Sequence, residues 1–198
     1  MFKNNKLIHG LNIGNYSIKI VSIHLLNKSI ELKKASFIKN EKDIFSDGMI
    51  NDPAAVKKSV EKLIGSNKKG FFSAAVANQF IVVRNMTLPY MKKEAINETI
   101  KWEFSEYIPF SIENAVIDYI IRKQSKKQLK ITAVIVPERI VNSYLNIFKD
   151  INLQTLNIEA AALLSLFKFK KINDNILIVD IGYHSTKLIV GNSLNIFL

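Results

Sequence analysis

Two stretches of the chain carry nearly the same pattern of residues that could bind phosphate. They read "LNIGNYSIKIV" at 11–21 and "VDIGYHSTKLI" at 179–189. Each is an apolar strand with Asn or Asp near its end, then a glycine turn with a serine and a lysine. Successive backbone N–H groups in such a turn can hold an anion, while serine adds a hydroxyl donor and lysine adds positive charge. Because the two copies match in register, they predict a two-lobed clamp around the phosphates of a nucleotide.

The predicted phosphate-binding residues come from both turns: Asn12, Gly14, Asn15, Tyr16, Ser17 and Lys19 from the first, and Asp180, Gly182, Tyr183, His184 and Ser185 from the second. We expect both glycines to let the backbone approach a ligand closely, in conformations barred to other residues. Asp180 could hold a hydrated Mg²⁺ that bridges phosphates. Asn12 brings no negative charge, so we predict weakened Mg²⁺-ATP binding and little or no hydrolysis.

Composition narrows the class of protein. With 198 residues, of which 48% are hydrophobic, the chain can bury a core, and with no cysteine it has neither disulfides nor thiolate sites. We see no signal peptide or membrane-spanning segment and expect a soluble intracellular protein. The net charge of +11 comes mostly from scattered lysine pairs without interleaved aromatics. This pattern disfavours nucleic acid and favours an anionic membrane surface or an acidic partner.

The spacing of apolar residues predicts alternating strands and helices. Residues 7–38 indicate three strands, Asp52 and Pro53 begin a helix, and "FFSAAVAN" at 71–78 indicates a buried strand. The first helix buries Val56, Val60, Leu63 and Ile64, and the helix at 138–151 buries Ile140, Val141, Tyr144, Leu145 and Phe148.

From residue 79 the order is strand, helix, strand, strand, helix, strand up to residue 157, which predicts one sheet covered by two helices. In the first of these helices, at 92–108, Ile96, Ile100 and Tyr107 are expected on one side. A short helix at 160–169 then leads to the second copy of the repeat. Since the chain stops soon after this copy, we expect a fragment or a truncated reading frame.

The two turns resemble the phosphate motifs of actin-like ATPases, and the segments between them resemble the PilM family of type IV pilus assembly. The matching words are "DGMINDPAAVKKSVEKLI", "MTLPYMKKEAINETIKWEFSEYIPFSIENAVIDY" and "VPERIVNSYLNIFKDINLQTLNIEAAALL". The most specific is "WEFSEYIPF", which is similar to the family's W-E-x-x-x-Y-I-P-F signature. The resemblance implies an α/β, actin-like (ribonuclease H-like) fold, with about the N-terminal half of a family member present.

The resemblance also implies a division into subdomains. Residues 1–78 correspond to subdomain 1A, 79–157 to the inserted β-α-β-β-α-β subdomain 1C, 158–174 to the closing helix of 1A, and 175–198 to an incomplete subdomain 2A. It implies a scaffold that captures the cytoplasmic N-terminal tail of a PilN-type inner-membrane protein in a groove between 1A and 1C. The resemblance further implies that other pilus machinery proteins are partners and that the chain self-associates. It also implies a peripheral location at the inner face of the cytoplasmic membrane. ATP and Mg²⁺ are the cofactors implied.

Two other functions stay open, an active actin-like ATPase and an FtsA-like cell-division filament protein. Glu159 has two interpretations: it orients the attacking water, or it is a first-turn acid favoured by the helix dipole. Trp102 and Tyr107 either contribute to a partner groove or pack in the core. His9 and His24 lack further ligands for zinc, so we interpret them as structural.

Overall fold

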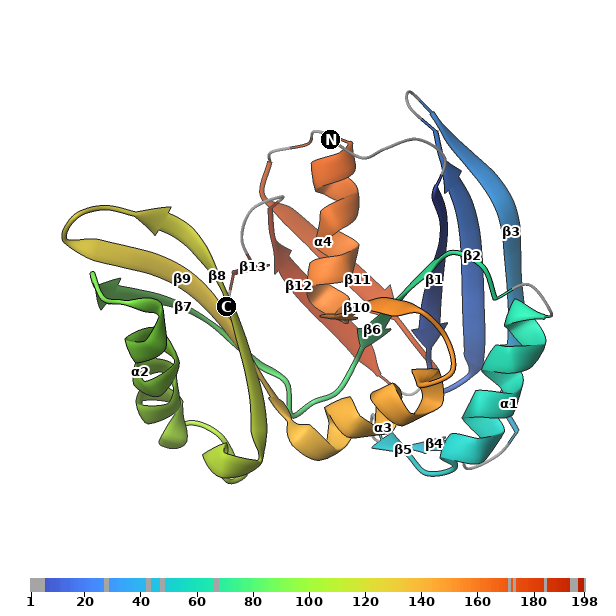
Figure 1. Cartoon of the computed structure of the whole chain (residues 1–198), viewed down its shortest axis with the longest axis horizontal. Coiled ribbons are helices and arrows are strands. Elements are labelled where there is room, and N and C mark those ends of the chain that lie inside the picture. The colour runs from blue at the N-terminus through green and yellow to red at the C-terminus, as the bar shows by residue number, and fades with distance from the viewer. Residues whose placement is uncertain are drawn as a thin grey trace. The chain divides into compact units, whose positions relative to one another are not determined.

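The chain forms two compact units, one from Met1–Gln79 with Asn142–Glu159 and the other from Phe80–Val141 with Ala160–Leu198. The structure is a computed structural model, and it describes residues 6–26, 29–41, 44–46, 49–65, 68–170, 172, 174–183, 185–192 and 196–197. Figure 1 labels the helices and strands of both units.

The first unit contains a five-stranded sheet in the order β10-β6-β1-β2-β3. β1, β2 and β3 form an antiparallel meander, whereas β6 runs parallel to both β1 and β10. Two short strands, β4 (Phe45–Ser46) and β5 (Met49–Ile50), pair separately. The strands of the large sheet are β1 (Lys6–Ile13), β2 (Ser17–Leu25), β3 (Ile30–Lys39), β6 (Phe71–Val76) and β10 (Leu153–Ile158).

Helix α1 (Pro53–Ile64) begins as the sequence predicts and lies against β2 and β3. The Asp52 carboxylate accepts the Ala55 N–H at 2.9 Å, and Pro53 occupies the first helical position, where no N–H is needed. All four residues expected on its apolar face are buried: Val56, Val60, Leu63 and Ile64. The expected face of α1 is confirmed.

Helix α3 (Glu138–Phe148) buries a slightly different face from the one expected. Ile140, Tyr144, Ile147 and Phe148 are buried, at the i, i+4, i+7 and i+8 positions of one helical stripe. Leu145 was expected on this face but is 45% exposed, because the fifth position after Ile140 turns away from the stripe. Burial raises the pKa of the Tyr144 hydroxyl well above its usual range, and the nearby Glu159 carboxylate adds to this shift.

The last strand of the predicted insert belongs to a different sheet from the one expected. The order of elements over 79–157 is confirmed, but β10 pairs with β6 in the first unit, with Leu156 opposite Ala74. The prediction of a single sheet covered by two helices is therefore wrong. The physical reason lies in β6, an apolar strand that needs a neighbour on each side when it is buried in the middle of a sheet.

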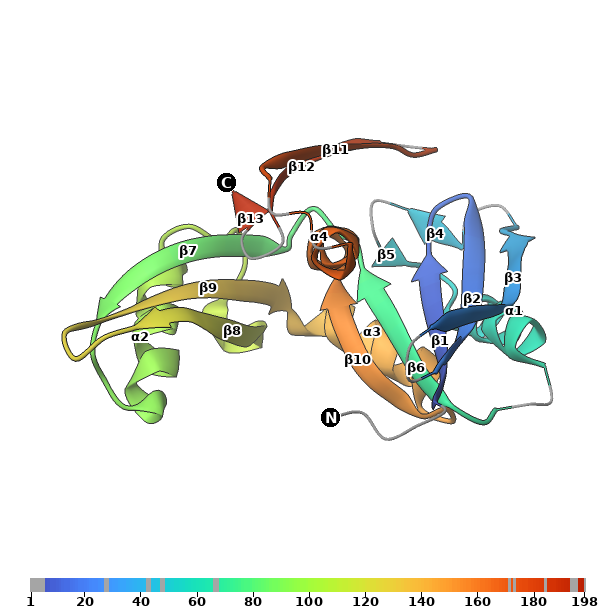
Figure 2. The ribbon, with the colours of Figure 1, turned by 90° about the horizontal axis from the view of Figure 1, so that it is seen from above.

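The second unit contains the three-stranded antiparallel sheet β7-β9-β8, from β7 (Val82–Pro89), β8 (Ala115–Gln124) and β9 (Gln128–Pro137). Helix α2 (Lys93–Ser105) covers one face of this sheet (Figure 2), and the short helix η1 (Ile112–Asn114) leads into β8. Ile96, Ile100 and Phe104 of α2 pack against Leu88, Leu129, Ile131, Ala133 and Ile135. Tyr107 was expected beside Ile96 and Ile100, but the helix ends before it and Phe104 takes that place.

A chain of polar contacts runs across the opposite face of this sheet. Arg122 Nε donates to Thr132 Oγ1 at 3.0 Å, and the same hydroxyl donates to Asn85 Oδ1 at 2.7 Å. Asn85 Nδ2 in turn donates to the Ile196 carbonyl of β13 (Ile196–Phe197) at 2.8 Å. Three strands of one sheet are thus linked through hydrogen bonds to a strand of another.

Three further elements complete the second unit, α4 (Glu159–Phe169, whose first residue belongs to the first unit), β11 (Ile176–Ile181) and β12 (Thr186–Gly191). The last two form an antiparallel sheet with β13 in the order β11-β12-β13. One set of alternating side chains on this sheet is exposed: Leu177, Val179, Ile181, Leu188 and Val190. None of the helices in the described part of the chain is both long and apolar enough to cross a membrane.

His9 has a structural role in the first unit. Its buried ring stacks on Phe72 with centroids 4.4 Å apart. The Ser22 hydroxyl lies 2.7 Å from Nδ1 and the Lys69 carbonyl lies 2.9 Å from Nε2, so Nε2 donates to the carbonyl and Nδ1 shares a hydrogen bond with the hydroxyl. Both ring nitrogens are engaged, which confirms the structural interpretation of His9.

Gly70, next to this ring, should tolerate no side chain. It has φ +106°, and a Cβ atom built there would lie 2.7 Å from the Leu7 carbonyl and 3.0 Å from His9 Nε2. We expect Gly70→Ala to lower the free energy of unfolding by about 3 kcal/mol or more, measured by urea denaturation.

Gly65→Ala is the matched control, because Gly65 has φ +73° but nothing within 4 Å of an added Cβ. It should cost only the backbone strain, about 1–3 kcal/mol. An equal loss in both variants would show that contact with Leu7 and His9 contributes nothing.

Candidate functional site

The two copies of the repeat fold into the same hairpin. In the first, Asn12 lies opposite Lys19, and the Gly14 N–H donates to the Ser17 carbonyl at 3.1 Å. In the second, Asp180 lies opposite Lys187, and the Gly182 N–H donates to the Ser185 carbonyl at 3.0 Å. The structural repeat predicted from the sequence is confirmed, with one turn in each compact unit.

The glycines of the two turns serve a different purpose from the one expected. Among the described glycines, only Gly65 and Gly70 have positive φ, so the expectation that Gly14 and Gly182 take conformations barred to other residues is wrong. A Cβ atom at Gly182 would lie 3.0 Å from the Ser185 carbonyl, and one at Gly14 would lie 3.4 Å from the Ser17 carbonyl. Glycine is favoured at Gly182 because that turn folds tightly onto its own backbone, whereas an added Cβ at Gly14 would make close to an ordinary van der Waals contact.

Asn40, which follows β3, holds the first turn and was not found from the sequence. Its Nδ2 donates to the Gly14 carbonyl at 2.7 Å and to the Asn15 carbonyl at 3.0 Å. Its backbone N–H donates to the Tyr16 carbonyl at 2.9 Å. The sequence signal was an Asn directly after a strand expected beside the turn, but neither propensity nor spacing indicated this contact.

The bonds to Asn40 fix the direction of three successive peptide units. The C=O and N–H of a trans peptide unit point in opposite directions, and the described chain has no cis bond. With the three carbonyl oxygens directed at Asn40, the N–H groups of Asn15, Tyr16 and Ser17 point away from it. Successive N–H groups with a shared direction are the arrangement that can hold an anion. The geometry of this turn is therefore compatible with a phosphate group.

The two hairpins differ in their charge. Lys187 Nζ lies 3.6 Å from Asp180 Oδ2, with each side chain 39% exposed, so the two charges compensate each other. In the first hairpin the cross-strand partner of exposed Lys19 is the neutral Asn12. The first turn thus has a positive charge without a carboxylate opposite it, which favours an anion, while the second has an ion pair.

The remaining predicted residues of the turns differ in exposure. Ser17 is buried, whereas Ser185 is exposed together with Tyr183. Tyr16 is also exposed, and the Lys39 ammonium lies 5.0 Å from the centre of its ring. His184 lies outside the described residues.

Asp180 is the single carboxylate that the two turns offer to a hydrated Mg²⁺. In the described part of the chain no group of three or more His, Asp or Glu side chains gathers as metal ligands. Mg²⁺ is held in proteins by carboxylates together with water and phosphate oxygens. The one carboxylate of the two turns, Asp180, is already in an ion pair with Lys187.

Glu159 is the first residue of α4 and the acid of its first turn. This position agrees with an acid favoured by the helix dipole. Its carboxylate also lies close enough to Tyr144 to raise the pKa of that buried hydroxyl. Its catalytic role stays a prediction.

Helix α2 exposes the only tryptophan of the chain. Trp102 is 73% exposed, so the expectation that it packs in the core is wrong. Tyr107 is 54% exposed, and the Arg84 guanidinium stacks 3.8 Å from the centre of its ring. Large exposed aromatics of this kind are the anchors that protein interfaces favour.

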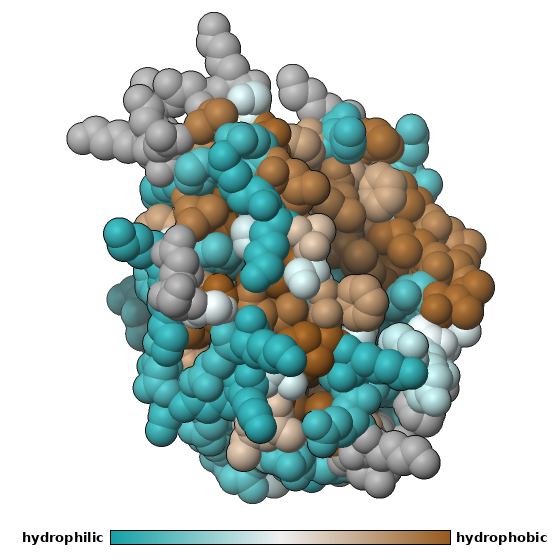
Figure 3. Space-filling view, turned by 90° about the vertical axis from the view of Figure 1, so that its right-hand side faces the viewer, coloured by the Kyte–Doolittle hydropathy of each residue, from teal (hydrophilic) through white to brown (hydrophobic). Residues whose placement is uncertain are grey.

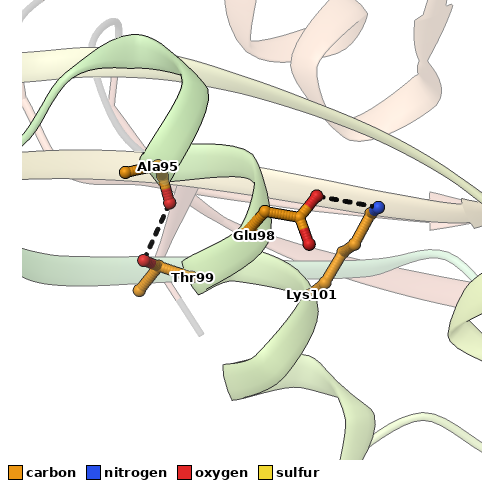
Figure 4. A network of polar contacts seen from close by, with 4 residues as sticks. All are labelled: Ala95, Glu98, Thr99 and Lys101. Carbon is orange, nitrogen blue, oxygen red and sulfur yellow. Dashed lines mark hydrogen bonds and ion pairs between the residues drawn. The ribbon is translucent and has the colours of Figure 1, made fainter.

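Two polar contacts link residues of α2 that precede Trp102 in the sequence (Figure 4). Lys101 Nζ donates to Glu98 Oε1 at 3.0 Å, and Thr99 Oγ1 donates to the Ala95 carbonyl one turn earlier at 2.8 Å. The Glu98 carboxylate raises the pKa of the Lys101 ammonium. These contacts stay within the helix and leave the indole in solvent.

Comparison with known families decides the identity. The sequence profile of a family described as type IV pilus assembly protein PilM matches residues 10–197. The chain belongs to the PilM family. The resemblance of "WEFSEYIPF" and its neighbouring segments to this family is thereby confirmed.

Solved structures agree with the PilM fold. A PilM–PilN type IV pilus biogenesis complex superposes with a TM-score of 0.80 at 23% identity, over 96% of this chain and 60% of that chain. The cytoplasmic domain of EpsL, an inner membrane component of the type II secretion system of Vibrio cholerae, gives 0.61 at 8% identity, over 96% of this chain and 69% of that one. No curated protein sequence matches the chain. The predicted α/β fold class is confirmed, and the chain shares the fold of the PilM structure, of whose length it spans 60%.

The Asn40 contacts give a direct test of how the first turn is held. Asn40→Ala removes both amide donors, and Asn40→Asp in addition places a carboxylate against two carbonyl oxygens. We expect Asn40→Ala to lower the free energy of unfolding by about 1–2 kcal/mol and Asn40→Asp by more, measured by urea denaturation at neutral pH.

The additional decrease in the free energy of unfolding that Asn40→Asp causes, compared with Asn40→Ala, should become smaller as the pH falls. The carbonyls raise the pKa of the new carboxyl in the folded state, so its protonated form is favoured there and stability is lost as the pH rises. Wild-type stability in both variants would show that Asn40 does not hold the turn.

Proposed function

We propose that this PilM-family chain is a scaffold of type IV pilus assembly that binds the cytoplasmic N-terminal tail of a PilN-type inner-membrane protein. The observation that carries the proposal is the agreement, over 96% of the chain, with a PilM structure from a complex with PilN. A scaffold needs a surface for its partner and no catalytic centre, and the turns of this chain contain a single carboxylate, Asp180.

The same proposal places the protein at the inner face of the cytoplasmic membrane. Attachment to the tail of a membrane protein would hold it there. The net charge of +11 would add attraction to anionic lipid headgroups, about 1 kcal/mol for each lysine near the surface.

Trp102 is the residue that we assign to contact with the tail. It belongs to the most family-specific segment of the sequence, and 73% of its surface is exposed although an indole gains much from burial. The helix that carries it is anchored from its other side, where Ile96, Ile100 and Phe104 are buried. A rigid helix with one exposed aromatic can bind an apolar side chain at low entropic cost.

We assign the nucleotide site a weak, non-hydrolysing role. The N–H groups of the first turn and the uncompensated Lys19 support binding of an anion. Two features argue against metal-dependent chemistry: Asn12 is neutral, and Asp180 is paired with Lys187.

Binding of the tail can be followed through Trp102 itself. We expect the intrinsic fluorescence to shift to shorter wavelength when a synthetic peptide of the N-terminal tail of the PilN-type protein from the same organism is added, because the indole leaves water. By calorimetry, Trp102→Ala should weaken binding about tenfold or more, which corresponds to about 1.4 kcal/mol.

Leu145→Ala, at an exposed apolar position of α3, is the control and should bind as the wild type does. Absence of tail binding by the wild-type chain would contradict the proposed function. Binding that Trp102→Ala leaves unchanged would contradict only the assigned contact.

Asn12→Asp tests the nucleotide site. A carboxylate at the end of β1 could order a hydrated Mg²⁺ but would also lie opposite Lys19, as Asp180 lies opposite Lys187, so we expect ATP affinity measured by calorimetry to fall about tenfold in EDTA and to recover when Mg²⁺ is added. Asn15→Asp adds the same charge within the turn, where it should repel phosphate and weaken binding. If Asn12→Asp gives no change between Mg²⁺ and EDTA, the missing carboxylate is not what limits metal binding.

A further inference from the structure

β3 is an open edge of the five-stranded sheet. It is the last strand in the order β10-β6-β1-β2-β3, and among the described residues it pairs with β2 alone. It is ten residues long, and all of it is exposed except the half-buried Ile38. An edge of this length presents a row of backbone N–H and C=O groups that an added strand can pair with.

The outward face of β2 and β3 carries exposed apolar side chains. Leu32 is 62% exposed and Phe37 is 64% exposed, with Ile30 and Val21 nearby at over 40%. In the register of the two strands, Leu32 lies opposite Ile23 and Phe37 lies opposite Lys19. Figure 3 is viewed from the right-hand side of Figure 1, the side on which β3 is drawn, and shows hydrophobic and hydrophilic residues both exposed there. Apolar groups clustered in this way mark an interaction site.

Lysines surround this apolar surface. Lys33 and Lys39 extend from β3 itself, and the exposed Lys19 lies opposite Phe37. The only acid on the strand, Glu31, is paired with Lys33 at 2.6 Å. Lys34 is directed to the other face, where its ammonium donates to the Leu63 carbonyl of α1. The edge therefore has a net positive charge in a chain of net charge +11.

This charge decides which kind of partner fits. A second copy of the chain would bring like-charged strands and two basic proteins together, which electrostatic repulsion opposes. The lysines of β3 also act against pairing of this edge with a second, equally basic copy. A strand with carboxylates would meet no such repulsion.

We propose that β3 binds an extended acidic segment of a partner protein as a sixth strand of the sheet. Its backbone pairs with the free edge of β3, its apolar side chains cover Leu32 and Phe37, and its carboxylates lie near Lys33 and Lys39. This site belongs to the first unit and is separate from the Trp102 surface of α2.

The probe is a fluorescein-labelled peptide, capped at both ends, of alternating glutamate and valine and as long as β3. Fluorescence anisotropy with the whole chain should show binding that weakens as salt is added. Phe37→Ser should weaken this binding about tenfold, and Leu188→Ser, at a similarly exposed position on a strand of the β11-β12-β13 sheet, should not. Circular dichroism confirms the fold of both variants.

Two altered peptides separate strand addition from simple charge attraction. Replacing glutamate by lysine should abolish binding, and N-methylation of alternate amides should do the same because it removes the ladder hydrogen bonds. Hydrogen exchange of residues 30–39 should slow with the parent peptide. Binding that survives N-methylation overturns the proposal.

Other occupants of the edge are outcomes of the same experiments. Sedimentation could instead show that the wild-type chain is a dimer, that Phe37→Ser is a monomer and that the peptide does not bind. This result would assign the edge to a second copy of the chain and overturn the proposal. Binding to phosphatidylserine vesicles that is lost in Phe37→Ser, again without peptide binding, would assign it to a membrane. Absence of all three kinds of binding also overturns it.

Discussion

The central strand β6 imposes the constraint on which the first unit depends. An apolar strand in the middle of a sheet must satisfy its backbone on both sides, because no water reaches it there. β1 satisfies one side and comes from the beginning of the chain, while β10 satisfies the other and comes after α3. The chain therefore leaves the first unit after β6, forms the β7-β9-β8 sheet with α2, and returns. Between these two attachments the inserted part builds its own sheet and its own core.

A duplicated hairpin need not be a duplicated site. The two turns share their register and their closing hydrogen bond, which follow from backbone geometry and a small residue at one position. Their electrostatics follow from one side chain each, an amide in the first and a carboxylate in the second. The amide of Asn12 in place of the carboxylate of Asp180 is therefore the difference that matters. It leaves the first turn suited to an anion, whereas the lysine of the second turn is already compensated by Asp180.

Local patterns predicted most of the elements, and long-range contacts account for the errors. Asp52, Pro53 and the apolar spacing of α1 act within one helix, so sequence alone sufficed there. The partner of β10 could not be read from β10, because pairing depends on which other strand has an open side. Sequence alone left two interpretations of Trp102 open because aromatic residues usually gain from burial, and only the packed structure shows that Phe104 is buried while Trp102 is exposed. Asn40 could not be found, since its three contacts join positions that are distant in sequence.

A series of hydrogen bonds from Arg122 through Thr132 and Asn85 to the Ile196 carbonyl connects two sheets mechanically. Thr132 is buried, so its hydroxyl cannot exchange a lost partner for water without cost. A displacement of β13 relative to β7 would stretch the bond at Asn85 first and then the buried one behind it. The β11-β12-β13 sheet and the β7-β9-β8 sheet are therefore not independent bodies under load.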